Sequence, residues 1–373
     1  MNGVVKISSW VGLSLASAAV AAAPLDTQLT VHDESPGEGY VEAGIDRMND
    51  TLDVFDIRGE SDNFSGSTIG DYDGHHLRGG IRIAPRLWID GAYWERDLTY
   101  GDDSADISSW QLAGQVRLLD HQGLRPGVSL RLGYWGNQLD ALHYNGTMSV
   151  AGYEIEDVKV PDLEDRQRQL DLIATWRPSS SWRYSLFAGV GRGEVDAGSP
   201  TATVNGRPST ISSPSTNRLI VEAQDPGMTG CGGADWCAGG PRGSPVSLSS
   251  SANGGPYPGP GMGINYDADY YQLGGNVAFS RSGWRALLGY AYLETSRDIE
   301  ELVARNGDTS YQVNQVLTTE VGRQVADHVG LLLRAQIYER QLLGEVPLTY
   351  NAYTTDWFDE VYGIVTLGVR FDF

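Results

Sequence analysis

Cysteine is scarce in this sequence, which has only Cys231 and Cys237 among its 373 residues. A structural zinc site needs four ligands, usually cysteine or histidine, and no histidine lies near this pair. The two thiols therefore do not make a zinc site by themselves. In an exported chain the expected state of the pair is a disulfide that closes a small loop.

Basic residues are also few. The 27 Lys and Arg stand against 48 Asp and Glu, which gives a formal charge of −21 at pH 7. Nucleic-acid phosphates are bound by positively charged surfaces, so this balance argues against a nucleic-acid partner. The sequence gives no reason to expect a cofactor or a bound metal ion.

Long hydrophobic runs are missing after the first 23 residues. No later stretch reaches the roughly 18 apolar residues that a transmembrane helix needs. Residues 1–23 carry one charge, on Lys6, followed by small apolar residues that end in alanines. This pattern predicts a secretory signal peptide over residues 1–23, followed by an acidic periplasmic lead over residues 24–38.

Alternation of apolar and polar residues is what the sequence has instead. In residues 39–46, Val41, Ala43 and Ile45 alternate with polar or small residues, which is the period of a β-strand. Further strands with this alternation are predicted at about 75–84, 87–96, 110–119, 127–138, 167–177, 182–195, 267–280, 283–297, 309–322, 328–341 and 361–373.

The predicted connections alternate between short and long. Short links fall at 84–87, 119–126, 177–182, 280–284 and 322–328, and long ones at 48–73, 97–108, 143–166, 196–266, 298–308 and 343–360. Outer-membrane barrels have short periplasmic turns and long extracellular loops. Residues 39–373 are therefore predicted to form an all-β, transmembrane, up-and-down antiparallel β-barrel of about 12 strands.

The long extracellular loop 196–266 leaves the strand count open. Its segment Val204–Arg207 reads VNGR, which predicts a type I′ hairpin turn. That hairpin either extends outside the membrane or adds two strands to the barrel, which would give about 14.

The last eight residues, 366–373, read TLGVRFDF. Thr366, Gly368, Phe371 and Phe373 make the pattern polar–x–Gly–x–x–aromatic–x–aromatic. This pattern resembles the C-terminal recognition signal of bacterial outer-membrane β-barrel proteins. The resemblance implies the outer membrane of a Gram-negative bacterium and assembly by the barrel-assembly machinery, and it indicates no particular member family.

Strand parity also assigns the residues that face the lumen. The candidates for the lumen lining are Arg78, Arg82, Asp90, Arg117, Arg131, Asp171, Arg285, Arg334 and Arg370. Arginine binds carboxylate, sulfate and phosphate, and arginines in a pore favour anions. If residues 85–87 form a three-residue loop, Arg82 lies opposite Asp90. If the last strand closes on the first, Arg370 lies near Glu42.

Three functions fit these residues. The first is an outer-membrane, porin-like channel for passive diffusion of small hydrophilic solutes, with a preference for anions. The second is a non-conducting structural or adhesive barrel whose lumen is braced by Arg–carboxylate networks and whose binding surface is loop 196–266. The third is a barrel hydrolase with His76 or His143 as general base. His143 is followed by Tyr144 and Asn145, which departs from the His-x-Ser arrangement of barrel phospholipases, so no catalytic residue is assigned and the sequence favours a non-enzyme.

The predicted outer loops are rich in acids, as in residues 102–106 and 154–165. Their carboxylates either bind divalent cations that bridge to lipopolysaccharide phosphates or are simply solvated. The expected partners are therefore outer-membrane lipids, lipopolysaccharide and small solutes.

Overall fold

The structure is a computed structural model. It describes residues 37–48, 71–100, 103–144, 148–150, 153–215, 218–223, 246–249, 265–306, 309–339 and 361–373. The predicted signal peptide and both cysteines, Cys231 and Cys237, lie outside these residues. Within these ranges no helix is long and apolar enough to cross a membrane.

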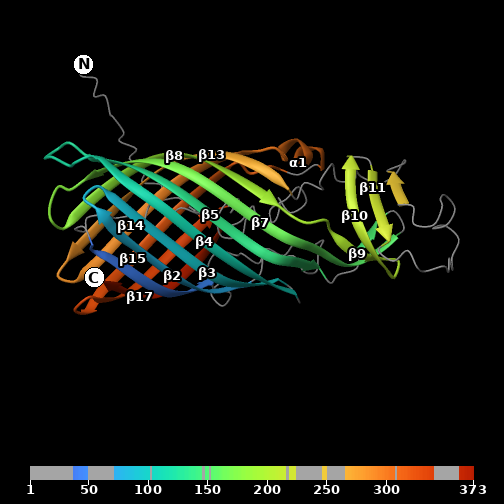
Figure 1. Cartoon of the computed structure of the whole chain (residues 1–373), viewed down its shortest axis with the longest axis horizontal. Coiled ribbons are helices and arrows are strands. Elements are labelled where there is room, and N and C mark those ends of the chain that lie inside the picture. Colours follow the sequence, from blue (N-terminus) through green and yellow to red (C-terminus); the bar gives the residue numbers. More distant parts are fainter. Residues whose placement is uncertain are drawn as a thin grey trace, which may run out of the picture.

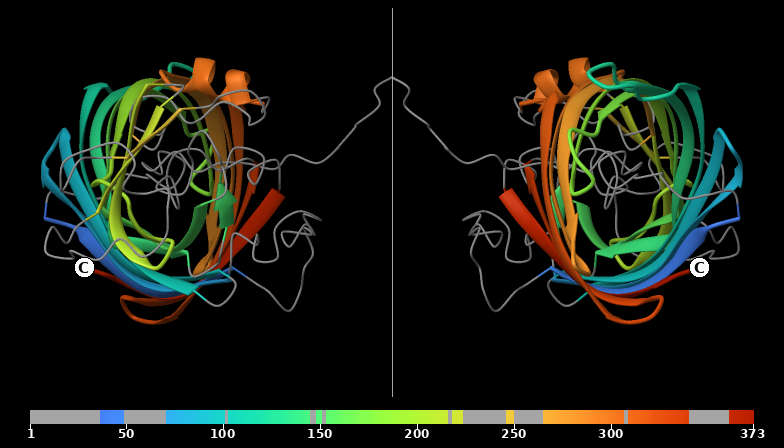
Figure 2. Two further views of the ribbon diagram at one scale, coloured as in Figure 1. Left: turned by 90° about the vertical axis from the view of Figure 1, so that its right-hand side faces the viewer. Right: turned by 90° about the vertical axis from the view of Figure 1, so that its left-hand side faces the viewer.

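A closed antiparallel barrel of 12 strands forms the body of the described chain (Figures 1 and 2). Its strands are β1 (Gly39–Met48), β2 (Asp71–Ala84), β3 (Leu87–Tyr100), β4 (Asp103–Leu119), β5 (Gly127–Tyr144), β7 (Tyr153–Trp176), β8 (Trp182–Asp196), β13 (Tyr266–Arg281), β14 (Trp284–Arg297), β15 (Val313–Ala326), β16 (Val329–Glu339) and β17 (Val361–Asp372). The ring closes through pairing of β1 with β17, so neither strand is left as an open edge. The predicted fold class and the smaller strand count are confirmed.

Further strands lie beyond one rim of the barrel (Figure 1). They are β6 (Met148–Val150), β9 (Thr201–Val204), β10 (Arg207–Ser215), β11 (Arg218–Ala223) and β12 (Val246–Ser249). The β9–β10 hairpin turns at Asn205 and Gly206, whose φ angles of 48° and 76° suit a type I′ turn. The predicted hairpin is therefore present, and it extends outside rather than adding strands to the barrel.

Three long loops differ from their prediction. Residues 97–108 were expected to be a loop, whereas β3 extends to Tyr100 and β4 begins at Asp103. Residues 143–166 were expected to be a loop, whereas β7 begins at Tyr153 and continues from the outer sheet into the barrel wall, pairing with β9 and then with β8. Residues 298–308 were also expected to be a loop and contain α1 (Glu300–Asn306). Burial of Ile299 and Val303 stabilises this short helix, and that tertiary contact is not visible in a strand-period analysis.

The outer face of the barrel is apolar. Leu132, Leu273 and Leu367 are 62%, 52% and 56% exposed, as expected for side chains that contact lipid. Exposed aromatic residues flank this band: Trp182, Trp284 and Phe371 at the end with the short turns, and Tyr93, Trp110, Tyr134, Tyr271 and Tyr290 at the other. This arrangement is the one expected of an outer-membrane β-barrel, whose short turns lie on the periplasmic side, and we call the end that carries the short turns the periplasmic end.

Candidate functional site

The predicted lumen residues all lie in the inward-facing register of their strands. Arg78, Asp90, Arg131, Asp171 and Arg334 are buried. Alternation along the strands assigns Arg82, Arg117, Arg285 and Arg370 to the same side, and these four are half-buried. The structure divides this set into two braces, a periplasmic cavity and a separate corner near the β2–β3 turn.

The first group, which we call the central brace, consists of Asp90, Arg131 and Asp171. Two nitrogens of Arg131 donate to the two carboxylate oxygens of Asp90, at 2.5 and 2.7 Å. Arg131 is also in register with Asp171 across β5 and β7. Asp171 accepts hydrogen bonds from Gln272 at 2.6 Å and from Gln169 at 2.8 Å. Buried ions in this arrangement are held by complementary charge and by hydrogen bonds together.

The second group, the closing brace, consists of Glu42, Glu320 and Arg334. Arg334 on β16 donates to Glu42 on β1 at 2.8 Å and to Glu320 on β15 at 2.8 and 3.0 Å. It therefore joins strands on both sides of the seam where the barrel closes. Arg370 pairs in register with Glu42, which confirms the predicted proximity of these two residues.

His76 belongs to the same seam. Its Nδ1 lies 2.7 Å from an oxygen of Asp46, and its Nε2 lies 3.4 Å from an oxygen of Glu42. Thr366 donates a further hydrogen bond to Asp46. His76, one of the two candidate general bases, is buried inside the barrel, where both ring nitrogens face carboxylates. His143 lies on β5 and is in register with Lys159.

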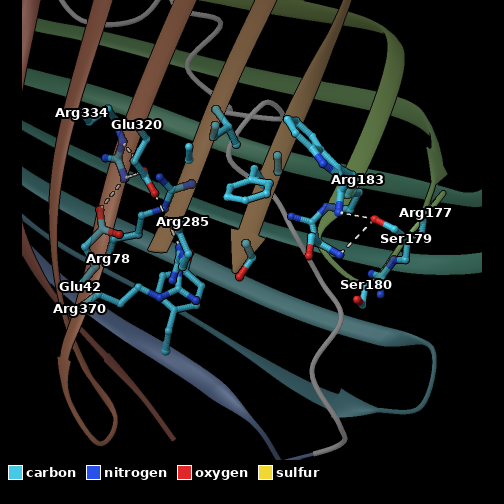
Figure 3. Close-up of a pocket in the computed structure, with 18 residues that line it drawn as sticks. Glu42, Arg78, Arg177, Ser179, Ser180, Arg183, Arg285, Glu320, Arg334 and Arg370 are labelled. Atoms are coloured by element: carbon cyan, nitrogen blue, oxygen red, sulfur yellow. Dashed lines mark hydrogen bonds and ion pairs between the residues drawn. The ribbon is translucent and has the colours of Figure 1, made fainter. Parts of the chain in front are cut away.

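A cavity of about 320 Å³ opens inside the periplasmic end of the barrel (Figure 3). Arginines and glutamates from several strands and from one turn line it. Six arginines of the described chain contribute, against two glutamates: Arg78, Arg177, Arg183, Arg285, Arg334 and Arg370 with Glu42 and Glu320. The lining is therefore predominantly positive.

The arginines in this cavity are not equivalent. The Arg334 side chain is 6% exposed inside the closing brace, whereas the Arg285 side chain is 41% exposed and lies 3.6 Å from Glu320 and 3.9 Å from Asp372. Arg370 contacts Asp372 at 2.7 Å and stacks 3.9 Å from the ring centre of Tyr40. Arg285 is therefore more accessible than Arg334 to a solute in the cavity.

Sequence reasoning missed two of these arginines. Arg183 on β8 lies on the same face of the strand as the buried Ser185 and Phe187. The two-residue period of a strand therefore predicts that Arg183 faces inward. Arg177 lies in the β7–β8 turn, outside the spanning strands, where no period applies. Burial, and next the charge of Arg183, lower the pKa of Arg177 to about 10.

Two predicted lumen residues lie apart from the cavity. Arg82 was expected opposite Asp90, but a bulge between Arg82 and Ala84 shifts the register, so that Arg82 pairs with Trp88 and Gly80 pairs with Asp90. The Arg82 guanidinium instead donates to the Ala84 carbonyl at 3.3 Å and to the Pro85 carbonyl. Arg117 lines the same small corner near the β2–β3 turn.

The residues of the C-terminal motif divide between the two faces of β17. Phe371 and Phe373 are exposed on the lipid side, whereas Thr366 is buried on the lumen side. Gly368 has the inward register of Thr366 and pairs with Gly44 of β1. This division is the one expected for a strand that closes the barrel.

Comparisons with known proteins agree at the level of architecture only. No protein-family model matches the sequence, and no curated protein sequence matches it. Among solved structures, the chain is similar to the β domain of the Bordetella autotransporter BrkA, with 12% identity, a TM-score of 0.42 and coverage of 91% of this chain and 100% of that one.

Two other solved barrels are similar to a comparable degree. The translocator domain of the autotransporter NalP from Neisseria meningitidis has 7% identity and a TM-score of 0.45, with coverage of 90% and 88%. The outer-membrane protease OmpT from Escherichia coli has 9% identity and a TM-score of 0.34, with coverage of 92% and 99%. At these values the likeness carries no argument about function, which has to come from the lumen itself.

Proposed function

We propose that this outer-membrane barrel is a channel for passive diffusion of small hydrophilic solutes and that its periplasmic mouth favours anions. The observation that carries the proposal is the cavity of about 320 Å³ with six arginines and two glutamates in its lining. Charges of one sign in a narrow opening with low-dielectric walls focus the electrostatic field and concentrate counter-ions. Arginine-lined pores favour anions for this reason.

The braces determine which arginines set the preference. Arg131 is fully buried against Asp90, and Arg334 is shared between Glu42 and Glu320, so their charges are largely compensated. Arg285 and Arg370 are more accessible to solutes, and their carboxylate partner Asp372 is itself 47% exposed to solvent. We therefore assign the selectivity to Arg285 and Arg370 and a bracing role to Arg131 and Arg334.

The braces also limit what passes. Their side chains lie on the lumen side of the wall, and those of the central brace are packed so closely that they are only 0–3% exposed. A path beside them suits single small ions and solutes rather than extended polymers. The channel proposed here is thus narrow, with a positive mouth on its periplasmic side.

The test is a planar bilayer measurement on the purified, folded protein across a KCl gradient. Stable conductance steps with a chloride-favouring reversal potential are expected. Arg285→Gln with Arg370→Gln should move the reversal potential toward that of a non-selective pore. Arg281→Gln, an exposed arginine at the β13–β14 turn outside the cavity, serves as the matched control. Inserted, folded protein that never conducts would overturn the proposal.

A second candidate is a non-conducting barrel that presents its outer sheet to a partner. Two observations favour it: the buried Arg–carboxylate braces and the extension of β7 into the sheet with β9. Replacing residues 201–249 by a short linker should then remove partner binding and leave a folded barrel. A conducting wild-type protein would count against this candidate.

The same proposal includes the partners of the barrel. The apolar outer band associates with membrane lipids. We propose lipopolysaccharide as the lipid of the outer leaflet in contact with it, and the barrel-assembly machinery as the receptor of β17 through Gly368, Phe371 and Phe373. Substituting Phe371 and Phe373 by serine should slow insertion of the barrel by that machinery.

A further inference from the structure

The β7–β8 turn, residues 177–181, has an ordered hydrogen-bond pattern of its own. The Ser179 hydroxyl oxygen accepts the backbone N–H groups of Ser181 at 3.3 Å and Trp182 at 3.2 Å. The Ser181 carbonyl accepts the N–H of Ser280 at 2.8 Å, which ties the turn to the end of β13. These hydrogen bonds restrict the backbone of the turn. Less conformational entropy of the protein is therefore lost when a ligand binds to its side chains.

Two arginines flank this turn. Arg177 is its first residue and Arg183 follows it on β8, and both are half-buried and line the periplasmic cavity. Figure 3 shows the Arg183 guanidinium turned toward Ser179 and Ser180, with Arg177 at the same turn. Their charges are close enough to repel, since Arg183 contributes to the lowered pKa of Arg177. At neutral pH both guanidinium groups are nevertheless protonated.

Two like charges held together by a fixed turn favour a bound counter-charge. From this geometry we infer that Arg177 and Arg183, with the Ser179 hydroxyl, form a binding site for a small tetrahedral oxyanion of the phosphate or sulfate class. A guanidinium donates two parallel hydrogen bonds to such an anion. The Ser179 hydroxyl oxygen accepts two backbone N–H groups, and its own O–H is the donor that the side chain can offer to an anion.

The chemistry discriminates between anions. A tetrahedral dianion has enough acceptor oxygens for two guanidinium forks and one hydroxyl at the same time. Chloride has one charge and no fork geometry, so it gains only the electrostatic part of the interaction. The site should therefore rank phosphate and sulfate above chloride. A merely positive opening would also favour divalent anions, so the variant that keeps both charges and removes both guanidinium forks distinguishes the two cases.

Binding to this site does not require that the barrel conducts. It is measured on folded protein in a non-ionic detergent, without a membrane gradient. A silent bilayer together with selective phosphate binding would remove the channel proposal and keep this site. A conducting barrel without selective binding would do the opposite.

The experiment is isothermal titration calorimetry of the folded full chain with sodium phosphate, sodium sulfate and sodium chloride at constant ionic strength. Phosphate and sulfate should bind at least about tenfold more tightly than chloride. Arg177→Gln with Arg183→Gln should weaken phosphate binding by about tenfold or more. Arg177→Lys with Arg183→Lys keeps the charge, removes the fork, and should give an intermediate affinity. Arg281→Gln should leave the affinity unchanged.

A parallel arm separates free phosphate from a lipid headgroup. The titration is repeated with inorganic phosphate in micelles with and without phosphatidylglycerol. Loss of phosphate binding when phosphatidylglycerol is present would mean that the arginines bind a lipid headgroup, and it would overturn a site for free anions in the lumen. Equal affinities for the three anions, or an unchanged affinity in the doubly substituted Gln protein, would also overturn it. If that variant does not fold, as judged by its heat-dependent mobility on a gel, the anion ranking of the wild type and Ser179→Ala decide the question.

Discussion

Arg131 on β5 reaches Asp90 on β3 across the whole width of β4. The residue of β4 that lies between the strands is Ala113, which pairs with Asp90 on one side and with Gly133 on the other. A small side chain there leaves room for the guanidinium to pass, and the two hydrogen bonds measure 2.5 and 2.7 Å. The ion pair thus joins second-neighbour strands, which the backbone ladder does not connect directly.

Removing one member of this pair should be costly. Arg131→Gln leaves the Asp90 carboxylate buried without its counter-charge, and we expect a loss of about 3–5 kcal/mol in the free energy of unfolding. Asp90→Asn combined with Arg131→Gln should recover a large part of the loss. Urea unfolding in lipid vesicles, followed by tryptophan fluorescence, measures both values. Arg117→Gln, at a half-buried position outside the brace, is the control, and an equal effect there would contradict the assignment.

Arg177, in the β7–β8 turn, differs from Arg131: replacing it should increase the free energy of unfolding. Burial and the charge of Arg183 lower the pKa of Arg177 to about 10 in the folded chain, so folding disfavours its protonated form. Below about pH 10 both folded and unfolded chains are protonated and the folded chain carries the full repulsion. Stability should then rise as the pH increases above about 10, because the unfolded chain binds the proton more tightly.

It follows that Arg177→Gln should stabilise the folded barrel at neutral pH. Arg177 is partly exposed, and screening by solvent reduces the expected gain to about 1 kcal/mol. The measurement is the urea midpoint in phosphate-free buffer for the wild type and the variant. Adding phosphate should narrow the difference between them, since bound anion removes the repulsion. A variant that is clearly less stable would contradict the repulsive pair.

Substitutions of Glu320 and of Arg285 should change the anion preference of the channel in opposite directions. It accepts hydrogen bonds from Arg334 and lies 3.6 Å from Arg285, so it compensates two of the cavity arginines. Glu320→Gln should therefore increase the anion preference, whereas Arg285→Gln should decrease it. Reversal potentials of both variants under one KCl gradient provide the comparison. A shift of both in the same direction would contradict the assignment of these charges to the conducting path.

Packing in the barrel wall is tested at Gly274. A Cβ atom at this position would collide with the Phe187 ring on β8 and would lie 2.5 Å from the Tyr290 carbonyl oxygen on β14. Gly274→Ala should destabilise the barrel by about 1–3 kcal/mol, because a backbone contact of this kind cannot be relieved by a rotamer change. Gly114→Ala is the matched control, since the nearest atom to its Cβ would be 4.0 Å away. Equal urea midpoints for the two variants would contradict the predicted clash.

Much of the wall could be predicted from alternation alone. The two faces of β1 follow directly from Val41 and Ile45 against Glu42 and Asp46, because the period of a strand is fixed by backbone geometry. The proximity of Arg370 to Glu42 followed from closure of the ring, which a membrane imposes on every barrel. Both results depend on general rules, the period of a strand and the closure of a barrel, and not on particular side-chain contacts.

What the sequence could not give depends on contacts between strands. The outer half of β7 contains Asp157 and Asp162 with φ angles of 48° and 52°, and these residues interrupt its alternation. The partner of Arg131 depended on a small residue on the intervening strand, and the partner of Arg82 depended on a bulge of one residue. Arg177 lines the cavity from a turn, where side-chain direction follows no period, so strand alternation could not assign it to the lumen.

The length of β7 has a consequence for how the cell surface meets this protein. Its 24 residues make an extended strand of about 80 Å, while the whole bilayer with its headgroups is about 40–45 Å thick. Even a strand tilted by about 40° rises well above the lipid. The strands β9–β12, which lie beyond the rim of the barrel, are therefore held well above the lipid headgroups (Figure 1). A large particle that contacts these strands is kept at that height above the membrane.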